Sequence, residues 1–143
     1  KLAPNVYNLT EIARAVAYEG ADAITAINTV PGMLIDAYAA KPIVKNTTGG
    51  LSGPAIKPVA LRAVWEIAQA VDLPIIGTGG ISTGIDAAEM IMAGASLVGV
   101  GSAVVDGGPA AFARIAKELQ TFMDEQAYPN IESMRGLAIK RGE

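Results

Sequence analysis

Glycine residues end two neighbouring apolar runs, and their backbone is the clearest source of chemistry in this sequence. The first run leads into Gly79 and Gly80, and the second, one helix later, leads into Gly101 and Ser102. With no side chain in the way, backbone N–H groups at such turns can point outward, and the helix starts that follow favour negative charge there. Each motif alone is also typical of a tight turn. Two adjacent strand ends of the same kind predict a site for a phosphate group.

Three further residues are candidates for ligand binding. Asn28 and Thr29 follow the apolar residues 23–27. An asparagine amide both donates and accepts hydrogen bonds, so it suits a planar heterocycle or a carboxylate. Lys1 belongs to the end of another expected strand, where its ammonium group would neutralise an anionic ligand. A loop cap at Asn28 and Thr29 and a solvated terminal lysine explain the same residues without a ligand.

The sequence contains neither cysteine nor histidine. Their absence excludes disulfides, thiolate nucleophiles, cysteine-ligated iron–sulfur clusters and the usual zinc sites, and it removes the commonest general base. Capping and solvated helix faces explain acidic residues such as Asp86 and Glu89. Lys45 and Lys57 are expected to be surface charges. We therefore predict no catalytic residue and no metal site in this sequence.

Composition describes one α/β domain, residues 1–143, with a sizeable core. The chain is 51% hydrophobic and 17% charged, and its mean hydropathy is +0.36. A net charge of −3 with no basic cluster argues against nucleic-acid binding. No apolar run approaches the roughly 20 residues of a membrane span, and the first residues do not resemble a signal peptide. We expect no membrane partner and a cytoplasmic location.

Helical and strand-like patterns alternate along the whole chain. Periodic apolar residues predict helices at residues 9–19, 58–71, 83–93 and 109–123, and short apolar runs predict strands at residues 23–27, 74–77 and 96–99. Asn8 is expected to cap the first helix, and Ser82 or Thr83 the third. Residues 30–57 are expected to form a long irregular loop with a functional role, and residues 128–143 at most one short helix.

The alternation predicts a parallel sheet with right-handed crossovers. Three complete strands and the end of a fourth at residues 1–2 are too few for a closed barrel, which needs eight strands and about 200 residues or more. The expected fold is therefore a set of parallel β/α units that form the second, carboxyl-terminal half of a TIM (β/α)8 barrel. In such barrels the loops after the last two strands commonly bind phosphate.

Five segments of the chain resemble those of a known enzyme family. They are KLAPN at residues 1–5, INT at 27–29, GGLSGPAIKP at 49–58, GTGGI at 77–81 and GVGS at 99–102. They occur in this order in dihydroorotate dehydrogenases, and the sequence is most similar to the soluble class 1 enzymes of the NAD-linked 1B type. The resemblance extends from residue 1 to about residue 122, and the GGLSGPAIKP segment is its most specific part.

The resemblance implies the latter half of an FMN-dependent barrel, strands five to eight. It assigns seven residues to FMN binding, namely Lys1, Ile27, Gly53, Gly79, Gly80, Gly101 and Ser102. The last four of these correspond to the phosphate site, in agreement with the glycine motifs above. Asn28 and Thr29 correspond to the pair that binds the orotate-type substrate. The family usually has threonine at the position of Ser102, and the hydroxyl group is kept.

The resemblance also implies an activity and partners for the complete enzyme. Such a flavoprotein oxidoreductase converts (S)-dihydroorotate to orotate in de novo pyrimidine biosynthesis: a base removes the C5 proton and hydride passes from C6 to N5 of FMN. The class 1 base is a cysteine on an upstream loop that this sequence lacks, so the chain alone is expected to be inactive. The implied partners are the missing amino-terminal half of the barrel, a further copy in a homo-oligomer, and an FAD and iron–sulfur subunit that passes electrons to NAD.

Two other interpretations remain open from the sequence. The chain is also compatible with a non-catalytic half-barrel that binds FMN or another phosphate and associates with itself. A phosphosugar enzyme of the same barrel class would contain an equivalent phosphate site, although its sequence would not need the GGLSGPAIKP segment. A preference for FMN over sugar phosphates separates these interpretations.

Overall fold

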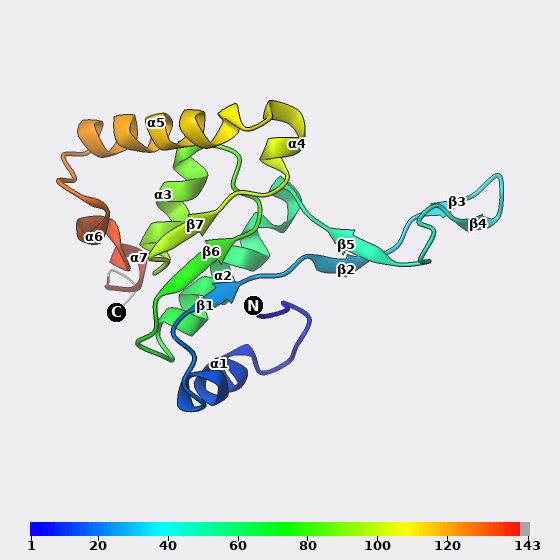
Figure 1. Ribbon diagram of the computed structural model, residues 1–143, viewed down its shortest axis with the longest axis horizontal. Helices are drawn as coiled ribbons and strands as arrows, with labels where there is room; N and C mark the ends of the chain where they lie inside the picture. Colours follow the sequence, from blue (N-terminus) through cyan, green and yellow to red (C-terminus); the bar gives the residue numbers. More distant parts are fainter. Residues whose placement is uncertain (141–143) are drawn as a thin grey trace.

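A parallel sheet forms the centre of the molecule. The computed structural model describes residues 1–140, and Figure 1 shows their arrangement. Strands β1 (Ile24–Ala26), β6 (Ile75–Thr78) and β7 (Leu97–Gly99) lie in that order, and both pairings are parallel. Leu2 adds a parallel bridge to Ala26 on the free side of β1. The neighbours in the sheet therefore follow the order of the chain, as the sequence predicts.

Helices connect the parallel strands. The longer ones are α1 (Leu9–Tyr18), α2 (Lys57–Ala68), α3 (Gly84–Met92) and α5 (Ala110–Glu125). A 3₁₀ turn, η1 (Pro54–Ile56), leads into α2, and the short helices are α4 (Ala103–Gly107), α6 (Ile131–Met134) and α7 (Leu137–Lys140). Gly20 and Gly94 end the first and third helices with positive φ angles of 88° and 115°, a conformation that glycine adopts without strain.

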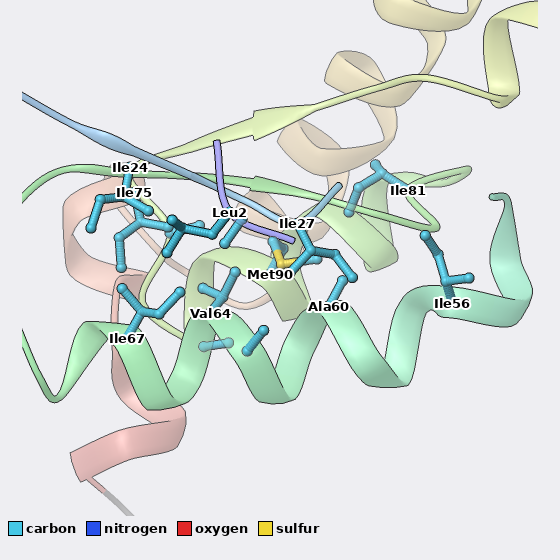
Figure 2. Close-up of a cluster of buried hydrophobic side chains, with 14 of the residues drawn as sticks. Leu2, Ile24, Ile27, Ile56, Ala60, Val64, Ile67, Ile75, Ile81 and Met90 are labelled. Carbon is cyan, nitrogen blue, oxygen red and sulfur yellow. The ribbon is translucent and has the colours of Figure 1, made fainter. Parts of the chain in front are cut away.

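The core lies between the sheet and the helices that pack against it. Figure 2 shows Val64 and Ile67 of α2 facing the strands, with Ile24 and Ile75 opposite. All four side chains are at most 2% exposed. Gly77 of β6 leaves room for Met90 of α3, because a side chain at that position would overlap the methionine. Small residues thus let the helices approach the sheet closely.

The two faces of the sheet differ in how well they are covered. Ile24 and Ile75 are paired in register and buried on the side of α2. The next row, Thr25, Ile76 and Leu97, points to the opposite side because alternate residues of a strand face opposite ways. Leu97 in that row is 64% exposed. The face away from α2 is therefore partly open.

Residues 30–57 are more regular than the sequence predicts. They include two antiparallel pairs, β2 (Val30–Gly32) with β5 (Gly49–Leu51) and β3 (Ile35–Asp36) with β4 (Lys41–Pro42). Figure 1 shows both pairs projecting from the body as an arm. The expectation of an irregular loop was wrong because the pairing joins residues that are separated in the sequence, such as Val30 with Leu51 and Ile35 with Pro42, and leaves no local periodicity.

Several helix details also differ from expectation. Asn8 makes no side-chain capping bond to α1, and its amide instead donates to Glu11 at 2.9 Å. Trp65 has the largest side chain of α2, but it is 39% exposed while Ile67 is completely buried. The segment after residue 127 contains α6 and α7 rather than one short helix, and residues 141–143 of that expectation lie outside the described residues.

None of the helices within residues 1–140 is both long and apolar enough to cross a membrane. The same residues contain no cluster of three or more potential metal ligands, as far as histidine, cysteine and carboxylate groups are concerned.

Candidate functional site

A pocket of about 150 Å³ lies at the carboxyl ends of the parallel strands, and we call it the strand-end pocket. Five separate segments of the chain contribute to its wall. The lining residues are Lys1, Ile27, Thr29, Ser52, Gly53, Ile56, Thr78, Gly79, Gly80, Ile81, Gly101 and Ser102. The parallel sheet explains this convergence, because strands that run in the same direction present their carboxyl ends at one edge.

All seven residues expected to contact FMN line this one pocket. Of the expected substrate pair, Thr29 lines it and Asn28 does not. Asn28 is exposed, and its backbone amide donates to the carbonyl of Leu2 at 2.8 Å. The structure therefore brings eight of the nine expected site residues together and leaves Asn28 beside them.

The sequence analysis missed four lining residues. These are Ser52, Ile56, Thr78 and Ile81. Each lies inside one of the motifs that carry the family resemblance, so the motif boundaries were the available signal. A position within a motif does not reveal which side chains face inward, since that depends on the turn that the backbone makes.

Two glycines allow the backbone to form the floor of the pocket. Gly80 has a φ of 77°, and a side chain there would lie 2.8 Å from the backbone nitrogen of Lys57. Gly79 has a φ of 138°, and its added Cβ would lie 2.7 Å from the Cβ of Ala60. Both positions combine a left-handed conformation with close packing on α2, so neither tolerates a side chain without movement of the loop or the helix.

The donors around the pocket suit an anion. Its lining includes four residues with hydroxyl groups, Thr29, Ser52, Thr78 and Ser102, as well as Lys1, and no aspartate or glutamate within residues 1–140 lines it. The backbone amides of Gly80 and Ser102 have no acceptor among the described residues. Gly80 is buried, and a buried amide without a partner is costly unless a ligand or water accepts from it. The donor set can therefore bind a phosphate.

The loop behind the glycines is tied to the start of α3 by a capping box. The Thr83 hydroxyl accepts from the Asp86 amide at 3.2 Å, and Asp86 accepts from the Thr83 amide at 2.8 Å. Asp86 also accepts from the Ser82 amide at 2.9 Å. Capping by Ser82 or Thr83 was expected from the sequence, and Thr83 is the residue that performs it.

Lys57 is not the free surface charge that the sequence suggests. Its ammonium group lies 2.6 Å from Asp86 and 2.7 Å from Glu89. The hydrogen bond to Asp86, followed by that to Glu89, raises the pKa of Lys57 above its ordinary value of 10.5. Burial tends to raise the pKa of Asp86, but the hydrogen bonds from Lys57 and two backbone amides outweigh it and hold that pKa below 3.8.

Helix α5 contacts the same loop from the other side. Arg114 donates to the Ser82 carbonyl at 2.9 Å, and Glu118 accepts from the Gly84 amide at 2.7 Å. Arg114 and Glu118 also pair with each other at 2.7 Å. The hydrogen bond from Arg114, followed by that from Gly84, lowers the pKa of Glu118 below its ordinary value of 4.5. The loop that leaves the pocket is thus bound on two sides.

Comparison with known proteins agrees with this geometry. The family model described as dihydroorotate dehydrogenase matches residues 1–123, which is most of the chain. The chain belongs to the dihydroorotate dehydrogenase family. The matched range includes every residue of the strand-end pocket and ends within α5.

Curated members of the dihydroorotate dehydrogenase family are about 50% identical to this chain over the aligned residues. A protein of Thermoplasma volcanium is 52% identical over 141 residues, and one of Geotalea uraniireducens is 50% identical over 140 residues. These alignments cover 99% and 97% of this chain but 46% and 45% of the relatives. Both relatives are named dihydroorotate dehydrogenase B (NAD(+)), catalytic subunit. The chain therefore spans about half the length of the curated relatives it matches.

Proposed function

We propose that this chain forms the carboxyl-terminal half of an FMN-dependent dihydroorotate dehydrogenase, and that its strand-end pocket holds the phosphate end of FMN. One observation carries the proposal: the seven residues assigned to FMN by resemblance, though dispersed over residues 1–102, line a single pocket. The family membership makes this activity the best-supported chemistry for such a pocket.

The residues present fit part of a flavin nucleotide. A phosphate would be held by the unpartnered amides of Gly80 and Ser102 and by the Ser102 hydroxyl, and Lys1 and Ile27 would contact other parts of FMN. The pocket volume of about 150 Å³ is below the range of roughly 300–1,000 Å³ that encloses a whole small ligand. This half of the protein therefore surrounds one end of the cofactor, and the remainder needs walls from elsewhere.

The open sheet face supports the half-barrel part of the proposal. The row formed by Thr25, Ile76 and Leu97 faces away from α2, and within residues 1–140 β7 pairs with β6 alone. A closed barrel buries such a row and pairs such an edge. The remaining half of the relatives' length is the natural source of the missing strands.

In the complete enzyme, FMN would supply the redox chemistry by accepting hydride from dihydroorotate. The residues of this chain would bind and orient: Asn28 and Thr29 would hold the substrate, and Lys1 would offset negative charge that develops on the ring. The base that removes the substrate proton would come from the other half, since this chain has no cysteine. We expect no dehydrogenase turnover from this chain alone.

The names of the relatives support further parts of the proposal. "Catalytic subunit" implies that those proteins work with another subunit, and NAD(+) names their electron acceptor. For this chain we propose the same arrangement: a cytoplasmic catalytic subunit, assembled as a homo-oligomer with an electron-transfer subunit that carries FAD and an iron–sulfur cluster. The cluster would belong to that partner, because this sequence offers no cysteine to bind it.

Titration of FMN into the purified chain, followed by quenching of flavin fluorescence, tests the proposal. We expect FMN to bind more tightly than riboflavin, which lacks the phosphate. Ribose 5-phosphate serves as competitor, and it should displace FMN poorly because it contacts only the phosphate end. Equal affinities for FMN and riboflavin would contradict the phosphate site. Equal affinities for FMN and ribose 5-phosphate would favour a phosphosugar enzyme instead.

A further inference from the structure

Four charged side chains hold the loop that supplies the pocket glycines, although none of them lines the pocket. The loop runs from residue 79 to residue 83, between β6 and α3, and Gly84 begins α3. We call the four residues the polar brace: Lys57, Asp86, Arg114 and Glu118. They come from α2, α3 and α5, so the brace joins three helices around one turn.

Between α2 and α3, the contact within the brace is short and its side chains are largely buried. The Lys57–Asp86 contact is 2.6 Å, and the two side chains are 25% and 13% exposed. Asp86 uses its other carboxylate oxygen to accept from the Ser82 and Thr83 amides, at 2.9 and 2.8 Å. Charged hydrogen bonds of this length are stronger than neutral ones, so they restrict the backbone they contact.

On the side of α5 the brace holds the next atoms of the same loop. Arg114 binds the Ser82 carbonyl and Glu118 binds the Gly84 amide, while the two side chains pair with each other. Gly84 itself packs against the α5 backbone so closely that a side chain there would overlap Leu119. Ser82, Thr83 and Gly84 therefore each have at least one backbone group bound to a brace residue.

Lys57 also touches the pocket loop through its own backbone. A Cβ added to Gly80 would lie 2.6 to 2.8 Å from three atoms of Lys57, so that glycine rests directly on the first turn of α2. Lys57 thus packs directly against Gly80. Through its ion pair with Asp86, it also helps to hold Ser82 and Thr83. A binding site built from backbone amides depends on such support, because the amides have no side-chain freedom with which to adjust.

We infer that the polar brace positions the backbone amides of the loop between β6 and α3 for binding the phosphate. Lys57 and Asp86 are the main residues of the brace. The inference rests on the proposed function, because it assigns the brace to the affinity for the FMN phosphate. It predicts that breaking the brace weakens the part of FMN binding that depends on phosphate, and leaves riboflavin binding unchanged. A purely structural role would weaken both ligands together.

The side chains of the brace could also change FMN affinity simply through their charge. Substitutions of the two partners of the Lys57–Asp86 ion pair separate this effect from positioning of the loop. Lys57→Met removes a positive charge, so both explanations predict weaker FMN binding. Asp86→Asn removes a negative charge and leaves Lys57 positive, so long-range attraction predicts tighter FMN binding. Positioning predicts weaker binding in both variants. Asp86→Asn is therefore the decisive substitution.

Matched controls are available on the same helices. Arg62→Met removes an ion pair with Glu66 from the exposed side of α2, and Lys117→Met removes an exposed charge from α5. Lys57→Arg keeps the charge and can reach both carboxylates, so it should restore most of the affinity lost in Lys57→Met. Circular dichroism establishes that each variant is folded before titration. If Lys57→Met or Asp86→Asn does not fold, Arg114→Met removes the contact from α5 instead.

We expect the dissociation constant of riboflavin divided by that of FMN to fall about tenfold in Lys57→Met and in Asp86→Asn. A loss of about tenfold is also typical when a residue that orients a metal ligand is removed. The controls should keep the wild-type ratio. An unchanged ratio in Asp86→Asn, or tighter FMN binding, would overturn the inference while leaving the phosphate site intact. A wild-type chain with equal affinities for both flavins would instead refute the proposed function, and the inference with it.

Discussion

Gly80 is the residue at which the pocket places the strictest demand on the backbone. Its φ is 77°, and an added Cβ would lie 2.6 Å from the Cβ of Lys57. Gly20 provides a matched control, because its φ is 88° and nothing lies within 4 Å of its added Cβ. The two glycines share the left-handed conformation and differ only in what surrounds them.

We expect Gly20→Ala to cost about 1 to 2 kcal/mol of unfolding free energy, the cost of a left-handed alanine. Gly80→Ala should cost about 1 to 3 kcal/mol more, because the overlap with α2 adds to it. It should also abolish the proposed preference for FMN over riboflavin. Urea unfolding and flavin titration measure the two effects. Equal stability losses would show that the loop can move away from α2.

The sequence revealed the residues of the site better than it revealed their partners. Glycines after apolar runs identify themselves, because few other residues tolerate such turns. Lys57 was misread as a surface charge because its partners Asp86 and Glu89 are 29 and 32 positions away. Pairing over that distance depends on how α2 and α3 pack, and no local pattern encodes it.

At the scale of elements, the ion pair at the start of α3 should make the stability of the folded chain depend on pH. Asp86 has a lowered pKa, so the stability that its contacts provide is complete above pH 3.8 and is lost as the pH falls through the lower value of the folded state. Lys57 has a raised pKa, so its contribution is complete below pH 10.5 and is lost as the pH rises above it.

Asp86→Asn should therefore destabilise the chain by about 1 to 3 kcal/mol at neutral pH, because it weakens hydrogen bonds to a charged acceptor. The difference from wild type should stay constant between pH 7 and pH 5 and shrink below pH 3.8. Urea unfolding at a series of pH values measures it. A difference that grows as the pH falls would contradict the lowered pKa of Asp86.

Helix α2 provides a second test at this scale, because its buried face is not the one expected from residue size. Ile67 is completely buried and Trp65 is 39% exposed. We expect Ile67→Ala to cost about 2 to 5 kcal/mol, and Trp65→Ala to cost less although the side chain is larger. Thermal unfolding compares the two variants. A larger loss for Trp65→Ala would contradict the burial of Ile67 and the exposure of Trp65.

Elements were predictable where the helical periodicity continued for several turns or where a short apolar run formed a strand. Helices α2, α3 and α5 and strands β1, β6 and β7 satisfy that condition. The antiparallel pairs of residues 30–51 do not, because β4 and β5 are exposed along their whole length and contain no apolar run that would identify a strand. Their pairing depends on cross-strand hydrogen bonds, which the sequence does not show.

At the scale of the whole molecule, the open face and edge of the sheet should determine how the chain associates. Leu97 is 64% exposed on β7 and lies on the partly open face of the sheet. Unpaired edges and exposed apolar rows favour association. We expect the purified chain to form oligomers whose fraction rises with concentration, as light scattering would show.

Leu97→Lys should raise the monomer fraction, because it places a charge on that row. Ile85→Lys is the control, since Ile85 is 50% exposed but lies on α3. An equal response to both substitutions would show that association does not use the sheet. A wild-type chain that stays monomeric at all concentrations would contradict the expectation altogether.

The strand-end pocket draws its wall from residues as far apart as Lys1 and Ser102. A molecule that contacts several parts of this wall acts as a cross-link between distant points of the chain, and it must leave before the chain can unfold. Its concentration then sets how often the unfolded chain is exposed, since binding to the native state alone stabilises that state by mass action. Proteases that degrade unfolded chains would remove copies without ligand first. The supply of cofactor would thus regulate how much of this protein a cell retains, in addition to how much of it is active.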